Sequence, residues 1–183
     1  MESILRRFYG LNVLTEPVIV RDIAEHYHSG MKLLVFGLGY DAVLWDALTE
    51  GNTYFVEDNR EYIALNEDID PSRIIYYDYK GISVERSFAI TDEEILAFPV
   101  PEALMEAGPF DLIFVSGPLS YNSACPGRLL PLFWSRYLLG SKDTLVYVDD
   151  SERRLESHCI ERFYGDCVKK RLLVSGGCVR IRL

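Results

Sequence analysis

LLVFGLGYDA, residues 33–42, joins an apolar strand to a helix through a turn with two glycines. The apolar run ends at Phe36, and such a run is typical of a strand that is buried on both faces of a parallel sheet. Gly37 and Gly39 let the backbone approach a ligand closely, although a tight turn without a ligand needs the same residues. Together with Ala42 they also satisfy the looser G-x-G-x-x-G/A pattern of dinucleotide-binding folds. The segment predicts a strand–turn–helix unit with a ligand at its turn.

Strand and helix patterns alternate over most of the remaining chain. Short apolar runs predict strands at residues 32–36, 53–56, 73–77, 111–115, 144–148, 167–174 and 178–183. Helical spacing predicts helices at residues 16–28, 40–49, 59–66, 101–107, 128–139 and 152–164. Thr15 is expected to cap the first of these helices, and Thr91 an acidic turn. Weak alternation at residues 81–89 predicts a further edge strand, and Ser175-Gly176-Gly177 predicts a hairpin between the last two strands.

Repeated strand–helix units imply a parallel sheet with right-handed crossovers, and the closing hairpin adds an antiparallel edge. We therefore predict an α/β, doubly wound, mostly parallel seven-stranded sheet with an antiparallel C-terminal hairpin, which is a Rossmann-like fold. A chain of 183 residues fits one domain with a sizeable core, and it contains no linker or repeat. Residues 1–183 are therefore expected to form a single domain.

The composition excludes several classes of protein. Hydrophobic residues make up 49% of the chain and charged residues 26%, which argues against disorder and coiled coil. Lys and Arg number 19 against 28 Asp and Glu, and the net charge of −9 disfavours nucleic acid or an anionic membrane as partner. No apolar window approaches the roughly 18 residues that span a membrane. Four single cysteines without CxxC spacing favour free thiols in a reducing compartment, so we expect a cytoplasmic protein: Cys125, Cys159, Cys167 and Cys178.

Ligands of doubly wound sheets lie at the carboxyl ends of the strands, beside the first strand. The residues predicted there are Gly37, Gly39, Glu57, Asp58, Asp78, Ser116, Gly117, Asp149 and Asp150. Glu57 ends the second strand, where a carboxylate suits the two ribose hydroxyls that NAD and S-adenosylmethionine share. Asp58 is a second candidate for the ribose, or a helix cap. Asp78 suits an adenine amino group, or forms a turn.

Asp149 and Asp150 form the pair with the most suggestive chemistry. Two adjacent carboxylates favour a divalent metal, or they raise one another's pKa enough for one of them to act as a base. The alternative is a helix cap at Asp150 or Ser151. Three aromatic residues fall near predicted loop mouths, where a ring can stack on a sugar: Tyr40, Tyr121 and Trp134.

Five segments together resemble the plant glucuronoxylan 4-O-methyltransferase and xylan-biosynthesis family. Residues 33–41, followed by Trp45, are similar to its apolar run, its F-G-L-G-H-D motif and its tryptophan. Phe55-Val56-Glu57-Asp58 resembles the end of its second strand, and Tyr77-Asp78-Tyr79-Lys80 resembles its Y-D-T-K segment. Residues 111–118, Tyr121 and Pro126-Gly127-Arg128 resemble its D-L-I-x-V-D-x-P…P-G-R block, and residues 146–153 its V-H-D-x-x-R stretch. The similarity runs in the same order from about residue 31 to about residue 161.

The resemblance implies an S-adenosylmethionine-dependent O-methyltransferase that acts on a carbohydrate, with the class I methyltransferase version of the fold. It implies that the cofactor lies on Gly37, Gly39, Glu57 and Asp78, with Ser116 near the methyl group. The acceptor sugar would meet Tyr121, Arg128 and the Asp149-Asp150 region. We expect Asp58 and Gly117 to complete the cofactor site, and we take Asp149, Asp150 and Ser116 as the catalytic candidates.

The sequence departs from the family pattern at two strand ends. Ser116 stands where the family has aspartate, and Asp149 stands where it has histidine. One carboxylate is lost and another gained, so a divalent metal held by Asp149 and Asp150 stays a candidate cofactor beside S-adenosylmethionine. The hypothesis for catalysis is that Asp149 or Asp150 is the base, or that the pair holds a metal that polarises the sugar hydroxyl. The family's N-terminal membrane anchor is not found, so a secretory-pathway location is not expected.

Two other functions fit parts of the pattern. A non-catalytic binding module with the same fold is favoured by Ser116 in place of an acid. An NAD-dependent oxidoreductase fits the glycine turn and Glu57, although the chain leaves little length for a substrate domain. The acidic net charge makes a neutral sugar at least as good an acceptor as glucuronate, with Arg128 as the residue that could pair with a carboxylate. The sequence predicts neither the sugar nor the oligomeric state.

Overall fold

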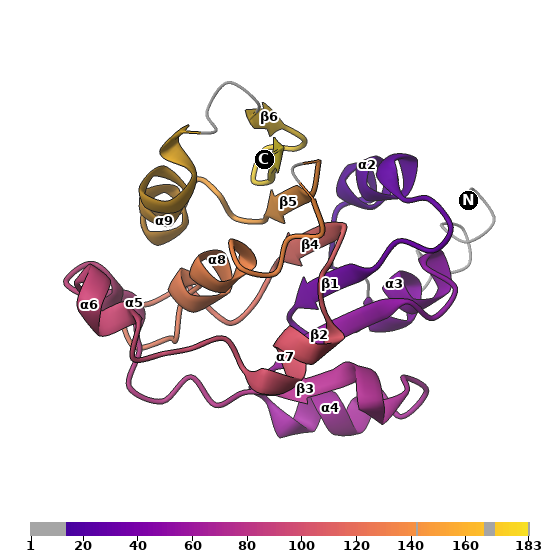
Figure 1. Ribbon diagram of the computed structural model, residues 1–183, viewed down its shortest axis with the longest axis horizontal. Coiled ribbons are helices and arrows are strands. Elements are labelled where there is room, and N and C mark those ends of the chain that lie inside the picture. The colour runs from indigo at the N-terminus through magenta and orange to yellow at the C-terminus, as the bar shows by residue number, and fades with distance from the viewer. Residues whose placement is uncertain (1–13, 142, 167–170, 183) are drawn as a thin grey trace.

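The structure, a computed structural model, describes residues 14–141, 143–166 and 171–182. Within these residues seven strands form one sheet in the order β3-β2-β1-β4-β5-β7-β6 (Figure 1). The strands are β1 (Leu33–Phe36), β2 (Thr53–Glu57), β3 (Ile74–Tyr76), β4 (Leu112–Val115), β5 (Leu145–Val148), β6 (Arg171–Leu173) and β7 (Val179–Arg182). Strands β1 to β5 are parallel, while β7 is antiparallel to both β5 and β6. The predicted sheet and hairpin are confirmed, and residues 167–170 and 183 of that hairpin lie outside the described residues.

Helices cover both faces of the sheet. They are α2 (Pro17–His26), α3 (Ala42–Leu48), α4 (Arg60–Leu65), α5 (Val84–Ser87), α6 (Asp92–Ile95), α7 (Glu102–Ala107), α8 (Leu129–Ser135) and α9 (Arg154–Tyr164), with a 3₁₀ turn η1 (Pro71–Arg73). Apolar residues of α2 and α3 form one core cluster with the sheet, and those of α8 and α9 form another. In Figure 1 α2 and α3 lie to the right of the strands, and α8 and α9 lie to the left. The molecule is therefore a doubly wound sandwich.

Strand β1 shows how one short strand serves both layers. Leu33 and Val35 belong to the cluster under α2 and α3, whereas Leu34 and Phe36 belong to the cluster under α8 and α9. Successive side chains of a strand point to opposite faces, so every residue of a central strand must be apolar. All four are buried.

The register of the parallel strands decides where their ends meet. Phe36 pairs with Val56 of β2 and with Val115 of β4, and Val115 in turn pairs with Val148 of β5. The residues that follow these four positions therefore lie at one edge of the sheet. This is the carboxyl edge, where the sequence places its candidate site.

Three local predictions were wrong. Residues 81–89 do not form an edge strand: Ser83 caps the helix α5, because its hydroxyl accepts a hydrogen bond from the Arg86 N–H. Thr15 does not cap α2, whose N-cap is Glu16; its hydroxyl donates to the Asp41 carboxylate instead, at 2.5 Å. Helix α8 ends at Ser135, four residues before the predicted end, because Leu139 is drawn into a bridge with Phe110.

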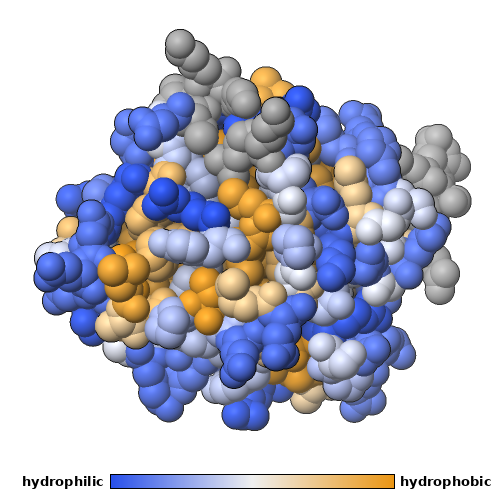
Figure 2. All heavy atoms as spheres, in the orientation of Figure 1, coloured by the Kyte–Doolittle hydropathy of each residue, from blue (hydrophilic) through white to orange (hydrophobic). Residues whose placement is uncertain are grey.

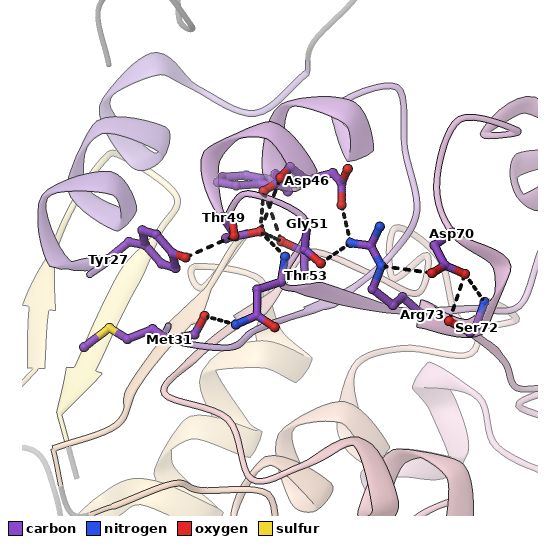
Figure 3. Close-up of polar contacts among 11 residues, drawn as sticks. Tyr27, Met31, Asp46, Thr49, Gly51, Thr53, Asp70, Ser72 and Arg73 are labelled. Atoms are coloured by element: carbon purple, nitrogen blue, oxygen red, sulfur yellow. Dashed lines mark hydrogen bonds and ion pairs between the residues drawn. The ribbon is translucent and has the colours of Figure 1, made fainter. Parts of the chain in front are cut away.

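A polar network ties the amino ends of β2 and β3 together (Figure 3). Arg73 of η1 donates to the carboxylate of Asp46 on α3 and to the carbonyl of Gly51, so it spans the turn that leads into β2. Beside it the buried hydroxyls of Thr49 and Thr53 lie 2.7 Å apart and also bind backbone carbonyls of α3. The network fixes the edge strand β3 at the end of the sheet opposite to the candidate site.

Three of the four cysteines lie in the described part of the chain. Cys125, Cys159 and Cys178 are buried free thiols, as the lack of CxxC spacing predicted, while Cys167 lies outside the described residues. Burial raises the pKa of Cys159 to about 12, so this thiol stays protonated and behaves as a small apolar group.

The surface of the molecule is mixed. Figure 2, in the orientation of Figure 1, shows hydrophobic residues gathered toward the centre of the visible face, with hydrophilic residues around them. Among the described residues, no helix combines the length and the apolar character needed to cross a bilayer.

Candidate functional site

The carboxyl ends of β1 and β4 touch through two glycines. A Cβ atom on Gly117 would lie 2.9 Å from the Cα of Gly37, and a Cβ on Gly37 would lie 3.2 Å from the backbone nitrogen of Gly117. Gly37 also has φ of +111°, which a side chain would strain. Packing of two strand ends therefore requires both glycines, in addition to the ligand role that the sequence predicted for them.

Ser116 lies between these glycines and β1. Its hydroxyl donates to the carbonyl of Phe36 at 3.1 Å, which ties β4 to β1. The serine is half-buried at the predicted edge, but this hydrogen bond occupies its hydroxyl.

Glu57 organises the glycine turn from the end of β2. One carboxylate oxygen accepts from the N–H of Leu38 at 2.6 Å, and the other accepts from the N–H groups of Asp58 and Asn59. Burial and the neighbouring Asp58 carboxyl raise the pKa of Glu57 to about 7, against the backbone bonds, which lower it. Glu57 lies where the sequence predicted it, but both of its oxygens are already bound to protein.

Asp58 and Asp78 lie beside Glu57 at the ends of β2 and β3. Asp58 is half-buried, and its pKa is raised mainly by burial and also by the charge of Asp78. Asp78 is exposed and pairs with Lys80 at 2.5 Å. The hydroxyl of Tyr79, close to the same carboxylates, is buried and finds no hydrogen-bond partner among the residues that the structure describes. These side chains form the acidic cluster, defined here as Glu57, Asp58 and Asp78.

The glycine turn, residues 37–41, places free backbone N–H groups beside this acidic cluster. In the described part of the chain the N–H groups of Gly39, Tyr40 and Asp41 donate no hydrogen bond. The carboxylate of Asp41 is held by the Thr15 hydroxyl and, at 3.1 Å, by the indole N–H of Trp45, so the turn into α3 is rigidly placed. Free N–H groups next to half-buried carboxylates suit a ligand that carries both an anionic group and hydroxyls.

The sequence predicts that Arg128 contacts the acceptor sugar, but its side chain points into the protein. It is 4% exposed, and its terminal nitrogens donate to the carbonyls of Ser116 and Asp149, each at 2.5 Å. One of them also pairs with the Asp150 carboxylate at 2.7 Å. Arg128 therefore clamps the end of β4 to the end of β5, and the sequence gives no sign of this because a buried and an exposed arginine read alike.

Asp149 and Asp150 differ in their surroundings. The two oxygens of Asp150 pair with Arg128 and with Arg153, the latter at 2.9 Å. Burial together with the Asp150 charge raises the pKa of Asp149, against the Arg128 charge and a backbone hydrogen bond from Asp150, which lower it. Neither aspartate caps α9, since its N-cap is Arg153 and no side chain caps it, and this corrects the capping alternative, Ser151 included.

The predicted metal site lacks ligands. Because both oxygens of Asp150 are bound by arginines, Asp149 is the only carboxylate of the pair that could face a cation. Within the described ranges no group of three or more His, Cys, Asp or Glu side chains is placed to hold a metal ion. The residues present do not fit a resident divalent metal.

The aromatic candidates separate into two kinds. Tyr121 is 67% exposed and lines a pocket of about 730 Å³ between α5, residues 120–123 and the start of α9. Tyr40 is half-exposed and packs edge-on against Tyr62. Trp134 is not at a loop mouth: it is fully buried, donates to the Phe98 carbonyl and stacks with Tyr79. Tyr79 and the pocket residues Ser120 and Glu156 were not predicted from the sequence. Only the burial of their polar atoms without hydrogen-bond partners among the described residues distinguishes them.

The sequence is similar to a family model and to several plant proteins. Residues 18–89 match the family model described as IRX15/IRX15L/GXM. The chain is 28% identical to Protein IRX15-LIKE of Arabidopsis thaliana, over 79% of this chain and 53% of that protein. It is 26% identical to Glucuronoxylan 4-O-methyltransferase 1 of the same plant, over 85% and 64%, and 30% identical to its Arabinogalactan O-methyltransferase 2, over 72% and 54%. The chain spans less than two thirds of the length of each of these relatives.

Solved structures share the fold at low sequence identity. An O-methyltransferase from Bacillus cereus has a TM-score of 0.51 at 13% identity, covering 100% of this chain and 90% of that one. A TehB-like SAM-dependent methyltransferase from Corynebacterium glutamicum has a TM-score of 0.53 at 14% identity, covering 98% and 95%. The resemblance predicted from the motifs is thus confirmed: the chain is similar to proteins of the plant IRX15/IRX15L/GXM family, and it has the Rossmann-like fold of class I methyltransferases.

Proposed function

We propose that the protein is an S-adenosylmethionine-dependent O-methyltransferase that methylates a sugar hydroxyl of a glycan or polysaccharide. The single observation that carries the proposal is the glycine turn held by Glu57 next to Asp58 and Asp78. The names of relatives, which include glucuronoxylan and arabinogalactan O-methyltransferases, support the reaction and the class of acceptor.

The residues at the turn fit S-adenosylmethionine, which when bound supplies an electrophilic methyl group. The free N–H groups of Gly39 and Tyr40 suit the carboxylate of its amino-acid portion. Asp58 suits the ribose hydroxyls better than Glu57, because the Glu57 carboxylate already accepts three backbone hydrogen bonds. Asp78 suits the adenine amino group, and the buried Tyr79 hydroxyl is a further donor close by.

Asp149 is the proposed general base. A sugar hydroxyl must lose its proton as its oxygen bonds to the methyl carbon, and a carboxylate near the acceptor can take that proton. Asp149 is half-buried and forms no ion pair among the described residues, whereas Asp150 is neutralised by two arginines. Asp150 and Arg128 then hold the strand end in place, and the closeness of base and acceptor supplies much of the rate.

The test of the cofactor is a calorimetric titration of the whole chain. S-Adenosylmethionine and S-adenosylhomocysteine are titrated, NAD is the control, and each titration is repeated with a divalent metal. We expect both sulfur compounds to bind, NAD to fail, and the metal to change neither affinity. A folded sample that binds neither compound contradicts the proposal, and binding of NAD alone would favour the oxidoreductase.

The test of the acceptor is transfer of a radioactive methyl group. Glucuronoxylan and arabinogalactan are the two polysaccharides to offer, since relatives of the chain are named for them. Methylation of either polysaccharide supports the proposal.

A non-catalytic binding module is the second candidate. Ser116 favours it, because the residue at this strand end carries no acid and its hydroxyl is bound to the Phe36 carbonyl. Cofactor binding without methyl transfer to either polysaccharide would support this reading.

A further inference from the structure

The pocket beside Tyr121 is built from three segments that meet next to β5. Its walls come from α5 and Phe88, from residues 120–123, and from residues 153–156 at the start of α9. Its volume of about 730 Å³ is large enough for one or two sugar rings. One wall residue, Arg153, pairs at 2.9 Å with Asp150, which follows the candidate base Asp149 in the chain.

Two residues that line this pocket hold polar atoms without partners. Glu156 is 0% exposed, and neither of its carboxylate oxygens has a hydrogen-bond partner among the described residues. Ser120 is 7% exposed, and its hydroxyl also lacks a partner. Buried polar groups are nearly always hydrogen-bonded, and an unpaired buried carboxylate is strongly unfavourable. The open acceptor and donor positions of these two side chains are therefore available to a bound ligand.

Arg128 offsets the charge of Glu156 without satisfying it. The Arg128 Nε lies 3.9 Å from the nearer Glu156 oxygen, too far for a hydrogen bond, and has no other partner. The terminal nitrogens of Arg128 are used by Ser116, Asp149 and Asp150. The carboxylate is thus kept close to a positive charge while its own acceptor positions stay open.

We propose that this pocket is the acceptor site of the proposed methyltransferase, and that Glu156 and Ser120 select a sugar through two neighbouring ring hydroxyls. The two oxygens of one carboxylate match a pair of adjacent hydroxyls, as in the recognition of ribose. The exposed ring of Tyr121 offers an apolar face on which a sugar ring can stack. Because Glu156 is fully buried, this assignment requires the neighbouring wall side chains to rotate when the sugar enters, and the sugar then provides the donors that Glu156 lacks. This assignment rests on the proposed function, since it takes the pocket's ligand to be the methyl acceptor.

Residue-resolved NMR on the unmodified full chain tests the location. Glucuronoxylan and arabinogalactan oligosaccharides are added separately in the presence of S-adenosylhomocysteine. We expect one of them to shift the amide signals of residues 120–123 and 153–156. Shifts confined to another part of the molecule, or none with either sugar while S-adenosylhomocysteine binds, overturn the acceptor site and leave the cofactor proposal standing.

Variants test the roles of the two polar residues. Glu156→Gln and Ser120→Ala are each expected to weaken binding of the oligosaccharide about tenfold or more, with unchanged affinity for S-adenosylhomocysteine. Glu161→Gln, an exposed carboxylate on the same helix, is the matched control and should bind as the unmodified chain does. Unchanged sugar affinity in both pocket variants overturns the assignment. If Glu156→Gln does not fold, Ser120→Ala and the NMR map decide.

The outcomes separate the two proposals. Sugar-induced shifts in the pocket of a chain that binds no S-adenosylhomocysteine would sustain the sugar site and refute the methyltransferase. If both pocket variants still bind the cofactor and transfer methyl groups with unchanged KM, the methyltransferase is supported and the sugar site is refuted.

Discussion

Gly117 has no room for a side chain, because the Cα of Gly37 lies where its Cβ would point. We expect Gly117→Ala to push β1 and β4 apart at the carboxyl edge and to lower the free energy of unfolding by about 1–3 kcal/mol. Chemical denaturation measures the change, and titration with S-adenosylhomocysteine should show a matching loss of affinity. Gly176→Ala is the control, since nothing lies within 4 Å of its added Cβ. Equal stability of the two variants would contradict the packing argument.

The proton-accepting role of Asp149 predicts a pH-dependent rate. Burial and the Asp150 charge raise its pKa above the ordinary value of 3.8, so the base is inactive while protonated and gains activity as pH rises through the raised pKa. Asp149→Asn should lower kcat by about 10²–10⁴-fold and remove this acid-side limb. Both effects are measured from initial rates of methyl transfer, across a range of pH, to the polysaccharide that the protein methylates. Asp68→Asn, an exposed carboxylate outside the site, should keep the full rate and the limb.

Single residues also show where the sequence stops being informative. Gly37, Glu57, Asp58 and Asp149 could be placed at the strand ends from the strand pattern alone, since register fixes which residues follow β1, β2 and β5. The partners of each side chain could not, because they depend on burial and on distant segments. As the arginine of a P-G-R motif, Arg128 was predicted to bind a ligand, yet it is 4% exposed and bound to two strand ends.

At the scale of secondary-structure elements, one clamp joins β4, β5 and α9. Arg128 binds the carbonyls of the residues that directly follow both strands, and it lies near Glu156 of α9. Lysine keeps the charge but has no planar fork, so Arg128→Lys should lower the free energy of unfolding by about 2 kcal/mol. Urea denaturation measures this, with Arg136→Lys, an exposed arginine after α8, as the matched control. A variant with full stability but raised KM would return Arg128 to the role of a sugar ligand.

The second clamp lies at the other end of the sheet, between η1, α3 and β2. Arg73→Ala would leave the Asp46 carboxylate and the Gly51 carbonyl without their donor. We expect a loss of about 1–3 kcal/mol and faster amide hydrogen exchange in β3, the edge strand that η1 introduces. Arg21→Ala, an exposed arginine of α2, should change neither quantity. Exchange that accelerates evenly over the sheet would show that Arg73 does not act on β3 in particular.

The elements that the sequence predicted well are those with a strong period. Strands β1, β4 and β5 are short apolar runs, and each lies within a residue or two of its predicted bounds. The strand predicted at residues 81–89 was wrong because α5 is only four residues long, which is too short for a helical period to be distinguished from an alternating pattern. Its only sign is the Ser83 hydroxyl at the cap, which a strand reading ignores.

For the whole molecule, a bound cofactor should raise the thermal midpoint. A ligand that binds only the folded state stabilises it by about 2.7 kcal/mol at a hundred times its Kd. For a chain of this size we expect S-adenosylhomocysteine to raise Tm by about 5–10 °C, and NAD to leave it unchanged. Differential scanning calorimetry provides the measurement. A shift with NAD equal to that with S-adenosylhomocysteine would contradict the cofactor assignment.

The parallel sheet and its antiparallel hairpin could be predicted because strands alternate with helices along the chain until the closing hairpin, whereas the strand order comes from the structure. The sequence also predicts a single domain and a cytoplasmic location, and these stay predictions. The pocket by Tyr121 lay beyond sequence reasoning, since three segments far apart in the chain build it and no period links them.

The contact between Gly37 and Gly117 also limits how this sequence can drift. Most crowded pairs in a core can exchange volume, because a larger residue at one position is tolerated once its neighbour becomes smaller. Here both neighbours already have the smallest side chain, and what each would strike is the backbone of the other. No substitution at one site can rescue a change at the other. The two positions are closed to neutral change, and any lineage that keeps this strand geometry must keep both glycines.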